Sequence, residues 1–180
     1  MKIIIYASEY GSTKQYAMEL SEKTGIRAVD YQKLDDINSY NTIIYLGGLY
    51  AGGILGMKKT FSKISDVSAK RIIIATVGLA DVSDKNNTHT IRKNIKGQLS
   101  DDVYNQAHIY FLRGAIDYSR LGLKHKTMMA LLYRKAKRLN ENQKTAEVKA
   151  MIETYGKKVS FIDFNSLNPI IDEIKGCSYD

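Results

Sequence analysis

The chain contains almost none of the residues that disulfide-bonded and metal-binding proteins require. Its 180 residues include one cysteine, Cys177, and three histidines. A single thiol cannot form a disulfide within the chain or supply a thiolate metal cluster. His89, His108 and His125 are far apart and show no ligand spacing such as HExxH. We therefore expect neither disulfides nor a metal site, and we expect a cytoplasmic location.

Proline and long apolar runs are also scarce. One proline indicates a chain without extended linkers. No apolar run approaches the roughly 20 residues that a membrane-spanning helix needs, and the first residues lack the apolar core of a signal peptide. With 44% hydrophobic residues, we expect one domain over residues 1–180 with a substantial core.

Acidic residues are absent from one stretch, residues 119–140. The chain carries 27 Lys and Arg against 19 Asp and Glu, a formal net charge of +8. Removing the seven basic residues of this stretch from the 27 leaves 20, which nearly balance the 19 acidic residues. The seven are Arg120, Lys124, Lys126, Arg134, Lys135, Lys137 and Arg138. The basicity is therefore local, and no nucleic-acid partner is expected.

Apolar segments alternate with helical patterns along the chain. Five segments rich in Ile, Val and Tyr lack strict alternation, which is typical of parallel strands covered on both faces: Ile3–Ala7, Ile26–Asp30, Thr42–Gly47, Arg71–Val77 and Ala107–Arg113. The helical patterns are Thr13–Lys23, Met57–Ser65, Thr88–Gln98, Lys124–Leu139 and Leu167–Ile174. This alternation predicts an α/β fold with a doubly wound parallel sheet.

Three loops follow the first, third and fourth predicted strands: Ser8–Thr13, Gly48–Gly56 and Gly78–Asn87. Ligands of doubly wound sheets bind beyond the carboxyl ends of the strands, where these loops would meet. The first loop leads into a helix N-terminus, whose free N–H groups and dipole favour a phosphate. Turn chemistry alone could explain any one loop. Their joint occurrence favours a cofactor that carries a phosphate.

The sequence lacks two common nucleotide-binding fingerprints: GxGxxG is absent after the first strand, and GxxxxGK[ST] is absent altogether. The sequence therefore does not favour NAD or a P-loop nucleotide as the phosphate-bearing ligand. The hydroxyl-x-x-Gly-x-Thr pattern of Ser8–Thr13 instead resembles the loop that holds the FMN phosphate in flavodoxins.

The resemblance extends through Gly47–Tyr50, the stretch Arg113–Arg120 with the basic helix and its Met128–Leu132 run, and Ile162–Phe164. On these residues the chain resembles the flavodoxin-domain family that includes bacterial menaquinone-dependent protoporphyrinogen IX oxidases. The resemblance implies a flavodoxin-like, doubly wound five-stranded parallel sheet of order 2-1-3-4-5 with helices on both faces. It also implies a basic helical insertion after the fifth strand, at about residues 118–156.

The resemblance further implies FMN as the cofactor. The hydroxyls of Ser8, Ser12 and Thr13 and nearby amides would hold the phosphate, Tyr50 or a neighbour would flank the ring, and backbone groups would bond its edge. The expected contacts are Ser8, Glu9, Tyr10, Gly11, Ser12, Thr13, Gly48, Leu49, Tyr50, Ala51, Gly52, Val77, Gly78, Leu79 and Ala80. No catalytic side chain is expected, because the flavin carries the electron chemistry.

Three functions remain open. The resemblance implies an oxidoreductase that oxidises protoporphyrinogen IX or a similar reduced substrate, with a quinone as acceptor. The alternative is a flavodoxin-type electron carrier that serves a redox partner protein, although such carriers usually present an acidic face. The third is a basic membrane- or nucleic-acid-associated module that binds no flavin and would purify colourless.

The basic segment, residues 120–138, also has three interpretations. Its apolar residues follow a helical stripe. The helix could lie on an anionic membrane surface, which would place the protein at the inner face of the membrane. It could attract an anionic substrate, or it could be a core-packed helix with a solvated charged face. The candidate contacts are Arg120, Lys124, Lys126 and Arg134.

Overall fold

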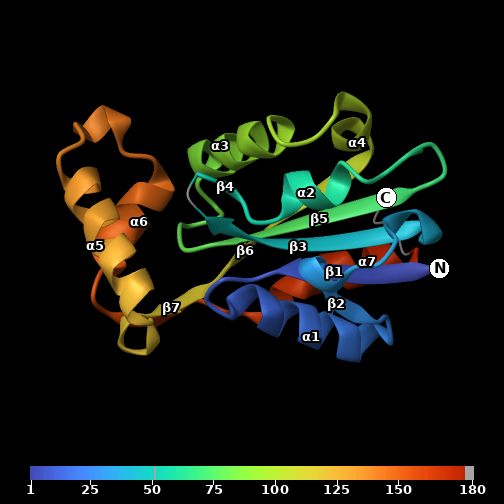
Figure 1. Ribbon diagram of the computed structural model, residues 1–180, viewed down its shortest axis with the longest axis horizontal. Coiled ribbons are helices and arrows are strands. Elements are labelled where there is room, and N and C mark those ends of the chain that lie inside the picture. Colours follow the sequence, from blue (N-terminus) through green and yellow to red (C-terminus); the bar gives the residue numbers. More distant parts are fainter. Residues whose placement is uncertain (51, 177–180) are drawn as a thin grey trace.

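Five parallel strands form the centre of the molecule (Figure 1). The computed structural model describes residues 1–50 and 52–176, so Ala51 and Cys177 lie outside the described residues. The strands are β1 (Lys2–Ala7), β2 (Ala28–Asp30), β3 (Thr42–Tyr50), β5 (Arg71–Gly78) and β6 (Ala107–Arg113). They lie in the order β2-β1-β3-β5-β6, and each neighbouring pair is parallel. This is the predicted order 2-1-3-4-5, and the predicted fold class is confirmed.

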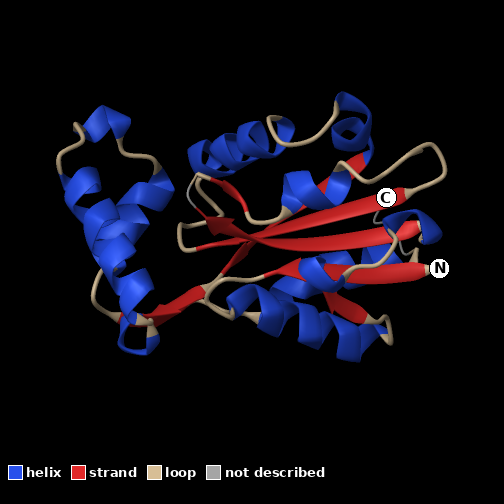
Figure 2. Ribbon diagram, in the orientation of Figure 1, coloured by secondary structure: helices blue, strands red, loops and turns tan. Residues whose placement is uncertain are grey.

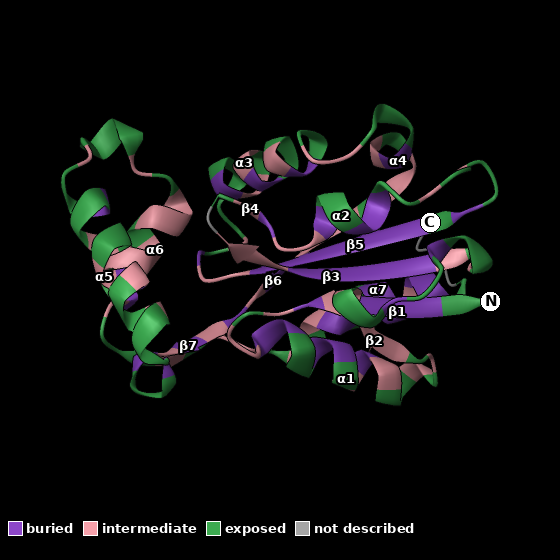
Figure 3. Ribbon diagram, viewed as in Figure 1, coloured by how far each residue is buried: buried purple, intermediate pink, exposed green. Residues whose placement is uncertain are grey.

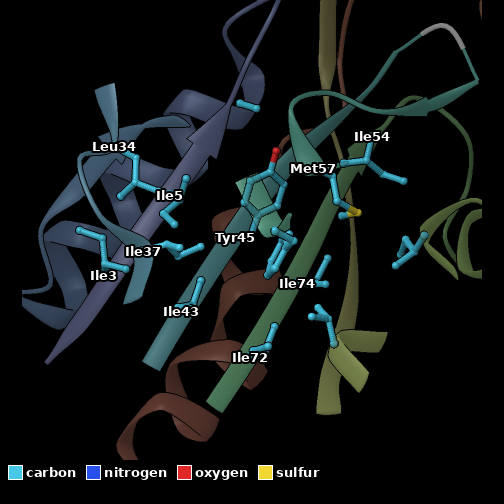
Figure 4. Packing of buried hydrophobic residues seen from close by; sticks show 14 of the residues in the cluster. Ile3, Ile5, Leu34, Ile37, Ile43, Tyr45, Ile54, Met57, Ile72 and Ile74 are labelled. Carbon is cyan, nitrogen blue, oxygen red and sulfur yellow. The ribbon is translucent and has the colours of Figure 1, made fainter. Parts of the chain in front are cut away.

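Both faces of the sheet are covered, which explains why the strand sequences do not alternate between apolar and polar residues. On one face, Ile3 and Ile5 of β1 pack in a cluster that includes side chains of α2 (Met57–Phe61), α3 (Lys85–Lys96) and α4 (Asp101–Gln106) (Figure 4). On the other face, Ile4 packs in a cluster with α1 (Ser12–Thr24) and α7 (Asn168–Lys175). Figure 3 shows the resulting burial along the central strands.

Several short elements were not expected from the sequence. Strand β4 (Gly53–Ile54) turns back antiparallel to the end of β3. Two expected helices have different bounds. Helix α2 ends at Phe61 and not at Ser65. Helix α3 begins at Lys85 and not at Thr88, because Asp84 caps it by accepting a hydrogen bond from the amide of Asn86. The described residues also contain five 3-10 turns: Tyr31–Lys33, Ile37–Ser39, Tyr118–Arg120, Glu141–Gln143 and Phe164–Leu167.

Two helices lie beyond the carboxyl ends of the strands, joined to the sheet through two short strands (Figure 2). Strand β7 (Ala115–Asp117) pairs antiparallel with β8 (Lys158–Ser160), and the chain between them forms α5 (Leu123–Lys137) and α6 (Ala146–Thr154). The sequence predicted one helix here, whereas the structure has two. We call β7, α5, α6 and β8 the helical insertion. A third apolar cluster, which includes Met129 and the partly buried Tyr10, packs it against the first loop.

Candidate functional site

A cavity of about 660 Å³ lies at the carboxyl ends of β1, β3 and β5, enclosed on one side by the helical insertion. Its volume is within the range of about 300–1,000 Å³ that is typical of small-molecule sites. Residues of all three predicted loops line it, as do residues of α3, α5 and α6. The structure thus brings together twelve of the fifteen predicted cofactor contacts. Of these, Gly11 and Ala80 are not part of the lining, and Ala51 lies outside the described residues.

The first loop ends in a helix N-terminus that no side chain of the described residues caps. Gly11 is the N-cap of α1 at φ +95°, a left-handed conformation that only glycine adopts readily. The first turn of α1 contains no acidic residue, and Ser12 and Thr13 are buried at its start. The amide of Gly11 donates to Ser8 Oγ (3.1 Å), which closes the loop. These features leave first-turn amides of α1 available to an anion.

Two side chains of α1 hold the ends of the helical insertion. Ser12 Oγ accepts a hydrogen bond from the amide of Ala115 (2.9 Å) and donates to its carbonyl (3.0 Å). The Tyr16 hydroxyl donates to the carbonyl of Arg113 (2.8 Å) and accepts from the amide of Asp163 (3.0 Å). Ser12 was expected to bind phosphate, and the structure gives its hydroxyl another partner. Helix α1 therefore positions both chain segments that enter and leave the insertion.

The first half of α5 covers the first loop. Glu9 Oε1 lies 2.7 Å from His125 Nε2, and the rings of Tyr10 and His125 meet edge to face, 5.7 Å apart. The Tyr50 hydroxyl donates to Met128 Sδ (3.1 Å), and the Tyr50 ring is 6.4 Å from that of Tyr10. Glu9, Tyr10 and Tyr50 thus face the insertion as well as the cavity.

The hydroxyl of Tyr10 is buried and has no hydrogen-bond partner within the described part of the chain. Burial raises the pKa of this hydroxyl to about 12, and the nearby Tyr50 and Glu9 add to the shift. Tyr10 is therefore neutral at physiological pH and keeps its O–H donor. Buried polar groups are nearly always paired, so this hydroxyl is one of few exceptions among the described residues.

The third loop is bonded by Glu147, a residue of α6 that sequence reasoning missed. Its carboxylate accepts hydrogen bonds from the amides of Leu79 (3.3 Å) and Ala80 (3.1 Å). Burial raises the pKa of Glu147, while the two amides and the nearby Arg113 act in the opposite direction. Arg113 also donates to the carbonyl of Leu79 (2.9 Å). No motif marks Glu147, because its contact depends on where α6 packs.

The four basic candidates, Arg120, Lys124, Lys126 and Arg134, are exposed and do not line the cavity. Arg120 lies in the 3-10 turn before α5, whereas the other three lie on α5, as do Leu123 and Leu131, whose exposed fractions are 83% and 61%. The inner side of α5 contributes Met128, Met129, Leu132 and Ala136 to the cavity wall. Among the helices that the structure describes, none has the length and apolarity that crossing a membrane would take.

A parallel sheet of this order, with a cavity at the carboxyl ends of its strands, defines a class of doubly wound α/β proteins that bind ligands at that edge. A family model described as "Flavodoxin domain" matches residues 3–143. The chain therefore belongs to the flavodoxin-domain family.

Solved structures with a similar fold include three flavodoxins. A mutant flavodoxin from Pseudomonas aeruginosa is 14% identical, with coverage of 76% of this chain and 97% of that chain and a TM-score of 0.41. A mutant flavodoxin from Fusobacterium nucleatum bound to flavin mononucleotide is 16% identical, with coverage of 66% and 71% and a TM-score of 0.42. A flavodoxin from the domain Archaea is 15% identical, with coverage of 63% and 85% and a TM-score of 0.35. No curated protein matches the sequence.

Proposed function

We propose that the protein binds FMN in this cavity and transfers electrons through it. The observation that carries the proposal is the uncapped start of α1, which adjoins a cavity lined by residues of all three predicted loops. Membership of the flavodoxin-domain family supports the choice of FMN among phosphate-bearing cofactors.

The residues present suit an FMN molecule. The first-turn amides of α1, together with the hydroxyls of Ser8 and Thr13, would hold the phosphate. Gly48 keeps this wall open, since a Cβ there would lie 3.2 Å from Thr13 Oγ1. Tyr10 and Tyr50 would contact the ring, because aromatic faces stack well on flat ring systems.

FMN would supply reversible electron transfer, and the protein would position it and set its surroundings. The apolar side chains of α5, including Met128, Met129 and Leu132, would keep water from the ring.

The electron donor and acceptor define two forms of this proposal. In the first, the protein is an oxidoreductase that takes electrons from protoporphyrinogen IX or a similar reduced substrate and passes them to a quinone. The apolar wall of the cavity and Lys135 of α5, which lines it, support this form, because they complement an apolar body and an acidic group. In the second, the protein is an electron carrier that serves a redox partner protein.

The outer surface of α5 supports a further part of the proposal, a cytoplasmic protein that associates with an anionic membrane surface. Exposed cations attract anionic headgroups, and exposed leucines such as Leu123 and Leu131 can enter the interface.

The first experiment is a titration of the purified protein with FMN, followed by quenching of flavin fluorescence. We expect the double variant Ser8→Ala with Thr13→Ala to bind at least tenfold more weakly. Ser21→Ala with Thr24→Ala is the matched control. It also removes one serine and one threonine hydroxyl, but at the other end of α1, far from the cavity. Absence of binding by the wild type, or equal affinity of all three proteins, would overturn the proposal.

A second experiment separates the two forms. The FMN-loaded protein is assayed under anaerobic conditions for oxidation of protoporphyrinogen IX with a menaquinone analogue as acceptor. Turnover would support the oxidoreductase. FMN binding without turnover would exclude this substrate and support the carrier.

A further inference from the structure

Glu147 extends from the helical insertion into the sheet edge. Its two carboxylate oxygens accept hydrogen bonds from the amides of Leu79 and Ala80, directly after β5. Gly78 makes room for it, since a Cβ there would lie 2.4 Å from Glu147 Oε1 and 2.6 Å from Leu49 Cδ1. The carboxylate therefore fills the space between the second and third loops of the cavity.

The same two amides are among the backbone groups expected to bond the edge of a flavin ring. Each backbone amide has one hydrogen to donate. A carboxylate that accepts from both, and that lies between Gly78 and Leu49, also takes the space that a ring edge would need. A ring bonded to these amides and the observed position of Glu147 thus exclude each other.

We infer that Glu147 is an internal ligand of the Leu79 and Ala80 amides that must leave them when the flavin ring binds, so that cofactor binding displaces α6. This inference rests on the proposed FMN site. It makes the helical insertion a latch: closed when Glu147 holds the amides, and released when the cofactor takes its place.

The contacts of Glu147 are suited to release. Hydrogen bonds from backbone N–H groups are usually about 2.7–3.2 Å long. The bond from the Ala80 amide to Glu147 is near the upper end of this range at 3.1 Å, and the bond from the Leu79 amide is longer, at 3.3 Å. Burial disfavours the ionised form of this carboxylate. Helix α6 is nine residues long and is connected to α5 through a 3-10 turn at Glu141–Gln143. Both hydrogen bonds to the third loop come from one side chain of this helix, so a rotation of Glu147 releases both amides without a change in the sheet.

The experiment compares FMN titrations of the wild type, Glu147→Gln, Glu147→Ala and the control Glu153→Gln. Glu153 lies on the same helix, is exposed, and loses the same charge in its variant. We expect both Glu147 variants to bind FMN about tenfold more tightly than the wild type, and the control to match the wild type. Equal or weaker binding by the Glu147 variants would overturn the inference, and weaker binding would mean that Glu147 holds the cofactor.

Hydrogen–deuterium exchange gives a readout that does not depend on affinity. On addition of FMN to the wild type, we expect faster exchange in residues 146–154 while the amides of Leu79 and Ala80 remain protected. FMN binding without any change in residues 146–154 would also overturn the latch. Failure of every protein to bind FMN would instead overturn the proposed function, so the two failures are distinguishable.

Discussion

Gly11 offers a test of the phosphate loop that separates conformation from contact. Its φ of +95° is left-handed, and no heavy atom of the described residues lies within 4 Å of the position that a Cβ would take. Gly11→Ala therefore adds no clash, and its cost is the backbone strain of about 1–2 kcal/mol for a left-handed residue with a side chain. In a chain of this size, that corresponds to a melting temperature lower by about 2–8 °C.

Strain at Gly11 can be relieved only by rotating the peptide units around it. That rotation breaks the hydrogen bond from the Gly11 amide to Ser8 Oγ and turns the neighbouring amides of α1. We expect Gly11→Ala to weaken FMN binding at least tenfold, which corresponds to about 1.4 kcal/mol. Fluorescence titration measures the affinity, and urea unfolding measures the free energy of unfolding.

Gly25 provides the matched control. It ends the same helix at φ +69°, and a Cβ there would likewise meet no heavy atom of the described residues within 4 Å. Gly25→Ala should lose similar stability and keep its FMN affinity, because it lies at the far end of α1. If both variants lose stability and both keep full affinity, the start of α1 does not hold the phosphate, and the site is assigned to the wrong loop.

Three further predictions follow from single contacts. Tyr16→Phe should lower the free energy of unfolding by about 1–3 kcal/mol, because it leaves the Arg113 carbonyl and Asp163 amide unpaired; an equal loss in Tyr6→Phe would contradict this. Burial raises the pKa of Glu147 in the folded state above its value in the unfolded state. This group therefore lowers the free energy of unfolding as pH rises from the unfolded pKa through the folded pKa. The stability of Glu147→Gln relative to the wild type should therefore increase with pH in urea titrations, and a constant difference would refute it. Leu123→Ser with Leu131→Ser should reduce co-sedimentation with anionic vesicles, whereas Met18→Ser, an exposed methionine of α1, should not; equal binding of both variants would argue against a membrane surface.

The central sheet was predictable because its signal is local. Ile3, Ile4 and Ile5 are all buried since neighbouring residues of β1 enter opposite apolar clusters. A strand that is buried on both faces requires apolar residues at successive positions, so it is visible in the sequence as a continuous apolar run. The three loops were predictable for a related reason, because parallel strands end at the same edge and bring their following residues together.

The helical insertion was predictable only in part. Its basic helix has a clear apolar stripe, whereas α6 is nine residues long and β7 and β8 are three residues each. Segments this short carry little periodicity, and packing against the rest of the chain decides their structure. The bond between Ser12 and Ala115 joins residues 103 positions apart, which no local pattern reveals.

The sequence by itself determined the strands, their covered faces, the three loops at one edge and the local excess of positive charge, because each depends on neighbouring residues. Only the tertiary structure decided which hydroxyls and amides at that edge already have partners. It assigned Ser12 to the insertion, left the Tyr10 hydroxyl without a partner among the described residues, and placed Glu147 on the amides of Leu79 and Ala80. Those outcomes depend on how α5 and α6 pack over the sheet, and distant segments meet only when the chain is folded.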